Sequence, residues 1–212
     1  MAYKTYILHI ETAPKPLAEL IANAPTFKAA ANLKDPVKIA EDIEKKKNKY
    51  FEEAAFSEAT GSICGIGLQN IEDGTVEQVC ALEQTEEDML RWLYAKINGQ
   101  GTVSFRGIRF VYPFVSRRAA IYTNLNFFSN IFYKYYSGRI EDDAHADVAQ
   151  VWACGNISHP ERLEDITSVL GLNYASPSVA YHKLLTEERK EEAAALLTRT
   201  LDTINEIWKK LQ

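Results

Sequence analysis

Two polar residues, His9 and Glu11, lie in an otherwise apolar stretch near the N-terminus, Tyr6–Pro14. The stretch begins as an apolar, β-branched run and closes on Thr-Ala-Pro, which predicts a buried strand followed by a turn. Side chains alternate along a strand, so His9 and Glu11 point to the same face. A polar pair at the end of an apolar strand is where an α/β sheet usually places a site, whereas the simpler interpretation is a satisfied core histidine beside a solvated carboxylate.

The chemistry open to this pair depends on which other side chains reach it. Glu11 offers a carboxylate, the kind of ligand that hard cations such as Mg²⁺ need. With His145 and a nearby aspartate, the pair could instead hold a softer ion such as Zn²⁺ or Mn²⁺. The spacing of these residues matches no closed zinc motif, so the softer-metal site is the weaker interpretation.

The overall composition limits the class of protein. Of the 212 residues, 46% are apolar and 25% charged, as in ordinary soluble globular domains. The formal net charge of −5 argues against a protein that coats nucleic acid broadly, but not against a local basic cleft. The three cysteines are far apart and form no CxxC pair, which fits a reducing cytosol. With no signal peptide and no apolar run of about 18 residues, we expect a cytoplasmic protein without a membrane span.

Hydrophobic periodicity and turn residues predict the elements that position the pair. In the long helical stretch after the first strand, Asp35 caps a helix that opens with Pro36. Thr85 caps a further helix whose first turn is acidic. We expect strands 1 to 3 to form an antiparallel meander. The later strands are predicted at 63–68, 75–82, 102–105 and 146–151, and the helices at 16–24, 36–54, 86–97, 163–170 and 187–211, with one more carrying Arg117 and Arg118.

The element order resembles the ribonuclease H-like fold, and three motifs sharpen the resemblance to the DEDD 3′–5′ exonucleases. Ile7–Pro14 resembles their first motif, Asp-Ile-Glu-Thr. Thr60–Leu68 looks like the second-strand signature of the subgroup related to family-B DNA polymerase proofreading domains. Ser104–Ala119 is similar to the second motif, Phe-Asn-Gly-x-x-Phe-Asp-x-Pro-Phe-Leu-x-Arg-Arg-Ala. It matches that motif at Phe105, Gly107, Phe110, Pro113, Phe114, Arg117, Arg118 and Ala119.

The resemblance covers nearly the whole chain, including a segment at 34–39 that is similar to an insertion in the subgroup. It implies a single domain over residues 1–212 with a three-layer α/β fold, a central mixed five-stranded sheet and a helical insertion after strand 1 at about 15–58. It also implies metal-assisted hydrolysis of a terminal phosphodiester, in which two Mg²⁺ or Mn²⁺ ions clamp the attacking and leaving oxygens.

The departures from the family pattern fall on its metal ligands. His9 stands where the first-motif aspartate is expected, Val111 stands where the second-motif aspartate is expected, and only Glu11 remains. Valine cannot bind Mg²⁺, and histidine is a poor ligand for it. Arg106 takes the place of the second-motif asparagine and could pair with Glu11, so that a guanidinium replaces the charge of the metals.

The third family motif, Tyr-x-x-x-Asp on the last helix, also departs from the pattern. It falls on Leu196 and Thr200, or on Thr198 and Asp202 if the register slips by two. The inner-face position of Leu201 fits the first register better, so we expect the third aspartate to be lost as well. The strand end, the second motif and this turn of the helix are then expected to converge on one vestigial cleft.

These losses predict a catalytically degenerate domain, a pseudo-exonuclease with negligible Mg²⁺-dependent nuclease activity and no cofactor. Glu11 is the one predicted site residue that could still hold a metal. Two alternatives stay open: an active 3′–5′ exonuclease with a non-standard site, and a protein-interaction or structural module that uses the aromatic surface near Tyr133 to Tyr136.

Arginines cluster around the second motif of this acidic chain. Arg117 and Arg118 lie on a predicted helix, where we expect one of them to serve a structural ion pair. Arg106 and Arg109 lie in the loop at the strand end, where the resembled family passes its substrate strand. We therefore expect weak, metal-independent and salt-sensitive binding of single-stranded DNA or RNA, carried mainly by Arg106 and Arg109.

Overall fold

The computed structural model describes residues 4–122, 145–154 and 162–212. Two compact units make up the chain: one is formed by Met1–Glu11 with Ile63–Gln212, and the other by Thr12–Ser62. The insertion predicted at about 15–58 falls in the range of the second unit. A single domain over the whole chain stays a prediction, and the aromatic surface near Tyr133 to Tyr136 lies outside the described residues.

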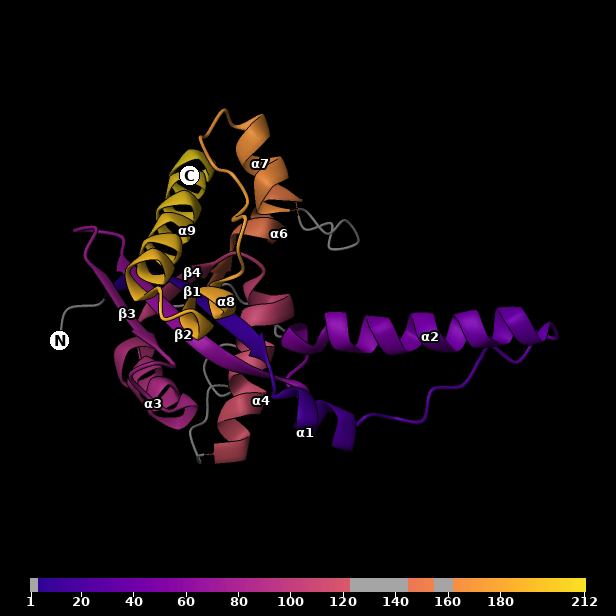
Figure 1. Ribbon diagram of the computed structural model, residues 1–212. Helices are drawn as coiled ribbons and strands as arrows, with labels where there is room; N and C mark the ends of the chain where they lie inside the picture. The colour runs from indigo at the N-terminus through magenta and orange to yellow at the C-terminus, as the bar shows by residue number, and fades with distance from the viewer. Residues whose placement is uncertain (1–3, 123–144, 155–161) are drawn as a thin grey trace. The chain divides into compact units, whose positions relative to one another are not determined.

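A mixed five-stranded sheet forms the centre of the first unit (Figure 1). Its strands are β1 Thr5–Pro14, β2 Gly61–Asn70, β3 Val76–Cys80, β4 Gly101–Ser104 and β5 His145–Asp147. They lie in the order β3-β2-β1-β4-β5, so the strand that carries His9 and Glu11 is central. β1 runs parallel to β4, β4 runs parallel to β5, and β2 pairs with β3 in antiparallel register. The predicted mixed sheet is therefore confirmed.

Helices cover both faces of this sheet, which gives three layers. They are α3 Glu86–Ile97, α4 Tyr112–Tyr122, α6 Val148–Trp152, α7 Leu163–Val169, α8 Tyr181–Thr186 and α9 Lys190–Leu211, with a π-helical turn η2 at Gly107–Val111. Leu8 of β1 packs in a core cluster with α3 and α4, whereas its neighbour Ile7 packs in a second cluster with α7 and α9. Because side chains alternate along a strand, His9 and Glu11 lie on the face of Ile7.

Two of these helices, α3 and α9, each bury a row of mainly apolar residues. At the start of α3, the Thr85 hydroxyl accepts a hydrogen bond from the Asp88 N–H at 3.2 Å, and the acidic first turn suits the helix dipole. The buried stripe residues are Met89, Leu90, Leu93 and Ile97 in α3, and Ala193, Leu196, Leu197, Leu201, Ile204 and Ile207 in α9. None of the helices in the described ranges combines the length and the apolarity that a membrane crossing requires.

Two elements differ from the sequence prediction. The predicted strand 146–151 is wrong in extent, because β5 ends at Asp147 and α6 begins directly after it. The Asp147 carboxylate accepts a hydrogen bond from the Ala149 N–H at 3.0 Å, so it caps a helix and ends the strand. The last helix begins at Lys190 instead of about 187. Glu188, with a left-handed φ of 56°, separates it from α8, which the sequence does not predict.

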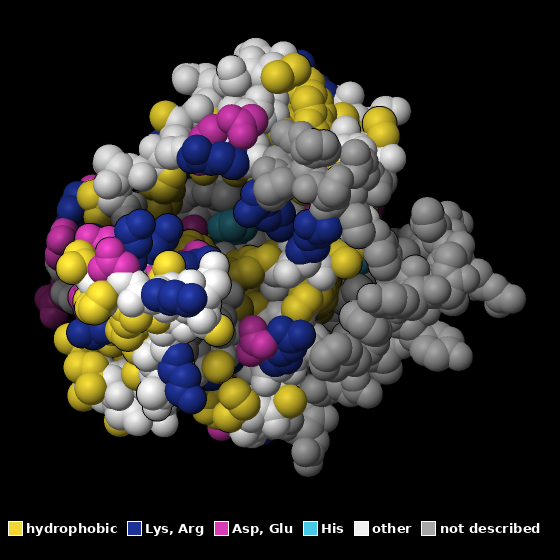
Figure 2. All heavy atoms as spheres, turned by 90° about the vertical axis from the view of Figure 1, so that its right-hand side faces the viewer, with side chains coloured by type: hydrophobic (Ala, Val, Ile, Leu, Met, Phe, Trp, Pro, Cys, Tyr) yellow, Lys and Arg dark blue, Asp and Glu magenta, His cyan; other side chains and the backbone are white. Residues whose placement is uncertain are grey.

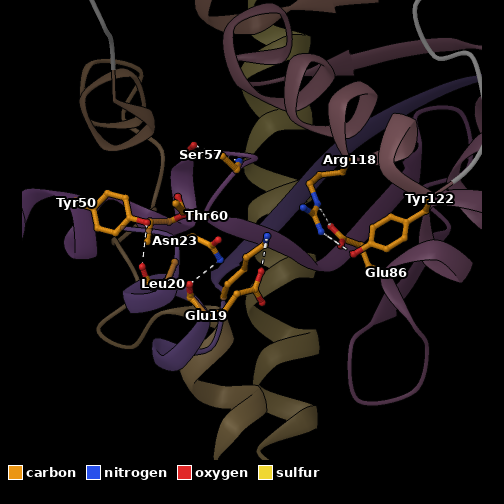
Figure 3. A network of polar contacts seen from close by, with 12 residues as sticks. Glu19, Leu20, Asn23, Tyr50, Ser57, Thr60, Glu86, Arg118 and Tyr122 are labelled. Atoms are coloured by element: carbon orange, nitrogen blue, oxygen red, sulfur yellow. Dashed lines mark hydrogen bonds and ion pairs between the residues drawn. The ribbon is translucent and has the colours of Figure 1, made fainter. Parts of the chain in front are cut away.

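A buried ion pair joins α4 to α3 (Figure 3). Arg118 Nε donates to Glu86 Oε1 at 2.8 Å, and Arg118 Nη2 donates to Glu86 Oε2 and to the Tyr122 hydroxyl. Glu86 Oε1 also accepts from the Ile63 N–H at 2.7 Å, which extends the network to β2. The prediction that one arginine of the second motif serves a structural ion pair is therefore confirmed for Arg118.

The second unit consists mainly of helices. It contains α1 Leu17–Ala22, α2 Pro36–Glu52 and a short 3₁₀ turn, η1 Ala54–Phe56. The predicted cap of α2 is confirmed, since the Asp35 carboxylate accepts a hydrogen bond from a first-turn N–H at 2.9 Å. None of the residues of α2 is buried, and Lys46 and Lys47 pair with Asp42 and Glu44 of the same helix at 2.8 and 3.9 Å. The charged run 44–47 is thus a solvated face of the helix.

Candidate site around Glu11

His9 and Glu11 form the centre of the candidate site. His9 Nε2 lies 3.3 Å from Glu11 Oε1, and the two side chains are 21% and 23% exposed. Their predicted common face is therefore confirmed. The other ring nitrogen, His9 Nδ1, is buried and has no hydrogen-bond partner in the part of the chain that the structure describes. The pair is a partly desolvated contact between an imidazole and a carboxylate.

Two side chains of α8 lie near the Glu11 carboxylate. The Tyr181 ring lies over Gly65 of β2, where a Cβ atom would come within 2.6 Å of it. Burial raises the pKa of the Tyr181 hydroxyl, and the charge of Glu11 adds to this rise. Burial and the charge of Lys183 lower the pKa of His182, whereas the charge of Glu11 opposes that effect. A phenol and a second imidazole therefore belong to the surroundings of Glu11.

The buried carboxylate of Asp147 accepts hydrogen bonds from the backbone of the second motif. Asp147 Oδ2 accepts a hydrogen bond from the Ile108 N–H at 3.0 Å, and the backbone N–H of Arg106 also donates to this carboxylate. Arg106 has a left-handed φ of 55°, and the residues after it form the η2 turn instead of the predicted loop. Burial raises the pKa of Asp147, while the backbone N–H donors oppose the rise. Asp147 thus holds the backbone that carries Arg106 and Arg109.

Val111, the second-motif position, is 1% exposed. It packs in the apolar cluster of α3 and α4 together with Phe114 and Val115. An aliphatic side chain in such surroundings offers a metal neither a ligand atom nor water.

Two residues could occupy the aspartate position of the third motif, Thr200 and Asp202, and the side chain of each makes a hydrogen bond within the protein. Thr200 is 4% exposed, and its hydroxyl donates to the Leu196 carbonyl at 3.1 Å. Asp202 Oδ1 accepts from Gln69 Nε2 at 2.6 Å, and Gln69 Oε1 accepts from Asn205 Nδ2 at 3.0 Å. The Asp202 carboxylate therefore ties α9 to β2.

Tyr174, in the segment between α7 and α8, lies near both Thr200 and Glu11. Burial raises the pKa of its hydroxyl, and the nearby Thr200 hydroxyl opposes the rise. The negative charges of Glu164 and Glu11 raise the same pKa further. The structure thus brings Thr200 into the surroundings of Glu11, while the convergence of Val111 and Asp202 on the same cleft stays a prediction.

Arg106 lies near the carboxylate of Glu164, a residue at the start of α7. Burial acts to raise the pKa of Glu164, but the Ser176 hydroxyl and the charges of Arg162 and Arg106 hold it below its usual value. Arg109 is exposed. Figure 2 shows basic side chains interspersed with acidic and hydrophobic ones on the face that it draws. On this face of an acidic protein, the described Lys and Arg side chains therefore do not form a continuous basic surface.

The described residues do not fit the metal pair that the resembled family uses. Within the described ranges, no three His, Cys, Asp or Glu side chains gather closely enough to hold an ion. His145, from the alternative softer-metal set, is buried and lies 3.1 Å from the hydroxyls of Thr102 and Ser104. Burial lowers the pKa of His145 to about 3. The alternative that joins His9, Glu11 and His145 around one ion is therefore wrong.

Sequence reasoning missed several residues near this site. Tyr174 and His182 come from the segment between α7 and α9, while Glu164 and Arg199 come from those two helices. In the sequence, Tyr174 is an aromatic residue in a polar loop, and the others are single polar or charged residues on helices. Such residues occur in any globular protein, so they do not indicate a site. Long-range packing brings them together, so no local spacing could have identified them.

The fold defines the chain as a three-layer α/β protein of the ribonuclease H-like type. It is similar to the family B DNA polymerase from the hyperthermophilic archaeon Pyrobaculum calidifontis, with a TM-score of 0.59 and 11% sequence identity. The similarity covers 99% of this chain and 24% of that polymerase. No protein-family model and no curated protein sequence matches the chain. At this identity, the comparison establishes the fold alone.

Proposed function

We propose that this chain is a nucleic-acid-binding domain with a 3′–5′ exonuclease-like fold and a degenerate catalytic site. The observation that carries the proposal is the distance of 3.3 Å between His9 Nε2 and Glu11 Oε1. In the family that the sequence resembles, the position of His9 holds a metal-binding aspartate. Here an imidazole lies beside the remaining carboxylate, so Glu11 has a partner other than a divalent ion.

The two other motif positions support the same conclusion. Val111 is surrounded by apolar side chains, and the Thr200 hydroxyl is used within its own helix. Two-metal hydrolysis needs several carboxylates whose like charges the ions neutralise. Glu11 alone does not supply such a set. The fold shared with a DNA polymerase supports nucleic acid as the ligand class.

We expect the protein not to shorten single-stranded DNA or RNA in the presence of Mg²⁺ or Mn²⁺. Without ligands for both metals, the site lacks the activated water and the stabilisation of the leaving oxygen, each worth several kcal/mol of the barrier. Denaturing gels with and without a chelator provide the measurement, and Glu11→Gln provides the control for a contaminating nuclease. Metal-dependent shortening that disappears in Glu11→Gln would contradict the proposal and favour the active exonuclease with a non-standard site.

We expect metal-independent binding of a single-stranded oligonucleotide at low salt, with Arg106 and Arg109 as major contacts. The double variant Arg106→Ala, Arg109→Ala should bind about tenfold more weakly, because each guanidinium offers charge-assisted hydrogen bonds to phosphate. The slope of log Kd against log salt should fall by about 0.7 for each phosphate contact that is lost. Fluorescence anisotropy at several salt concentrations measures both quantities.

The matched control for this double variant is Arg91→Ala, Lys96→Ala. Both residues lie on α3, which packs with the Leu8 side of the sheet. Arg91 pairs with Glu87 of α3 and Lys96 with Glu77 of β3, so the same charge is removed away from the site. Wild-type affinity in the control is the expected result. Absence of binding by the wild-type protein at low salt rules out the proposed ligand, and equal losses in both double variants exclude a specific role for the two arginines.

A further inference from the structure

Two arginines from separate parts of the chain lie near Glu164, and a third, Arg199, lies over the Tyr174 ring. Arg162 Nε is 3.6 Å from Glu164 Oε2, and the charge of Arg106 helps to lower the pKa of the same carboxylate. The Ser176 hydroxyl, two residues after Tyr174, donates a hydrogen bond to Glu164 Oε1. Burial raises the pKa of the Tyr174 hydroxyl, the charge of Glu164 raises it further, and the charge of Arg199 opposes the rise. Arg162 precedes α7, Arg106 follows β4 and Arg199 lies on α9, so only the fold brings these groups together.

The Arg199 guanidinium lies over an aromatic ring. Its Cζ atom is 5.7 Å from the centroid of the Tyr174 ring, within the range of a cation–π contact. Arg199 is exposed, whereas Tyr174 is half-buried and packs against the α7–α9 core cluster. A guanidinium at the protein surface thus lies over a half-buried aromatic ring.

The charged side chains around Tyr174 and Glu164 favour an anionic ligand. Arg106, Arg162 and Arg199 carry three positive charges, whereas Glu164 and Glu11 carry two negative ones. The Glu164 side chain is 31% exposed and the Arg162 side chain 66% exposed, so their ion pair is weak and open to competition from an anion in solution. A phosphate can replace this carboxylate as the acceptor for the guanidinium groups, because it offers equivalent bidentate geometry.

We propose that Tyr174, Arg199 and Arg162 form a second part of the nucleic-acid site, with Glu164 as a carboxylate that the bound phosphate displaces. Arg199 and Arg162 bind successive phosphates of a single strand, and the guanidinium stacked on Tyr174 supports an adjacent base. The inference rests on the proposed nucleic-acid binding and extends it by naming the surface that the strand follows beyond Arg106. Aromatic and guanidinium faces stack on any base, so binding at this surface tolerates sequence variation.

The first test removes the cation and its support separately. Arg199→Ala should weaken binding of a fluorescent single-stranded oligonucleotide about fivefold and lower the salt slope by about 0.7. Tyr174→Ala should also weaken binding about fivefold, whereas Tyr174→Phe keeps the ring and should bind nearly as wild type. Arg91→Ala, an exposed arginine of α3, is the matched control and should leave the affinity unchanged. Wild-type affinity in both Arg199→Ala and Tyr174→Ala would overturn the inference.

The second test distinguishes a binding role from a structural one. Glu164→Gln removes a negative charge but keeps an acceptor for Ser176, and it should tighten binding about threefold because a competitor of the phosphate is lost. A purely structural role predicts unchanged or weaker binding in this variant, which would overturn the inference. If the wild type binds and the Arg106→Ala, Arg109→Ala variant is impaired, failure of these tests leaves the proposed function intact. Absence of binding by the wild type overturns both.

Discussion

Replacing Arg118 with alanine is expected to lower the free energy of unfolding by about 3–5 kcal/mol, the cost of leaving one partner of a buried ion pair uncompensated. The Glu86 side chain is only 9% exposed and would lose its guanidinium donors while keeping the Ile63 N–H. A charge that is this far removed from water cannot recover its solvation without opening the structure. The same substitution also removes the contact with Tyr122 that holds the end of α4.

Denaturant unfolding followed by circular dichroism measures this loss. Arg91→Ala is the matched control, because Arg91 and Glu87 form an exposed pair at 2.8 Å on α3, and its loss should cost less than about 0.5 kcal/mol. The double variant Glu86→Gln, Arg118→Met should be more stable than Arg118→Ala, because it leaves no buried charge and keeps an acceptor for Ile63. Similar losses for Arg118→Ala and Arg91→Ala would show that the buried pair does not stabilise the contact between α3 and α4.

The sequence predicted the elements whose signals are local. The apolar run around Ile7 and Leu8 identified β1, and the Thr85 cap with its acidic first turn identified α3. The common face of His9 and Glu11 followed from strand alternation alone. These features depend on neighbouring residues, so packing did not alter them.

Short elements were less predictable because tertiary contacts decide them. The segment 146–151 has an apolar pattern that suits a strand or a helix, and the capping bond of Asp147 settles it as a helix after three strand residues. The six residues of α8 are too few to show a helical period, yet Tyr181 packs over Gly65 and fixes them on the sheet. The candidate site shares this property, since Tyr174 and Glu164 reach it only through the packing of α7 and α9.

The second motif contains a glycine whose role becomes clear only in the folded chain. A Cβ atom at Gly107 would lie 1.9 Å from His145 Nε2 and 2.2 Å from Ser104 Oγ. The His145 ring is 8% exposed and is held by Thr102 and Ser104 at 3.1 Å each, so it has no space into which to move. Close approach of the backbone to this ring therefore requires a residue without a Cβ atom.

We expect Gly107→Ala to cost about 3 kcal/mol of unfolding free energy, the upper part of the usual range for overpacking a tight core. Gly99→Ala is the control: Gly99 has a left-handed φ of 73° and no atom within 4 Å of the added Cβ, so only backbone strain of about 1 kcal/mol is expected there. Denaturant titration of Gly107→Ala, His145→Ala and the double variant completes a double-mutant cycle. Removing the ring relieves the clash with His145 but not the one with Ser104 Oγ, so the double variant should still lose stability, but less than the sum of the two single losses. Additive losses would mean that contact with His145 is not the reason for a glycine at this position.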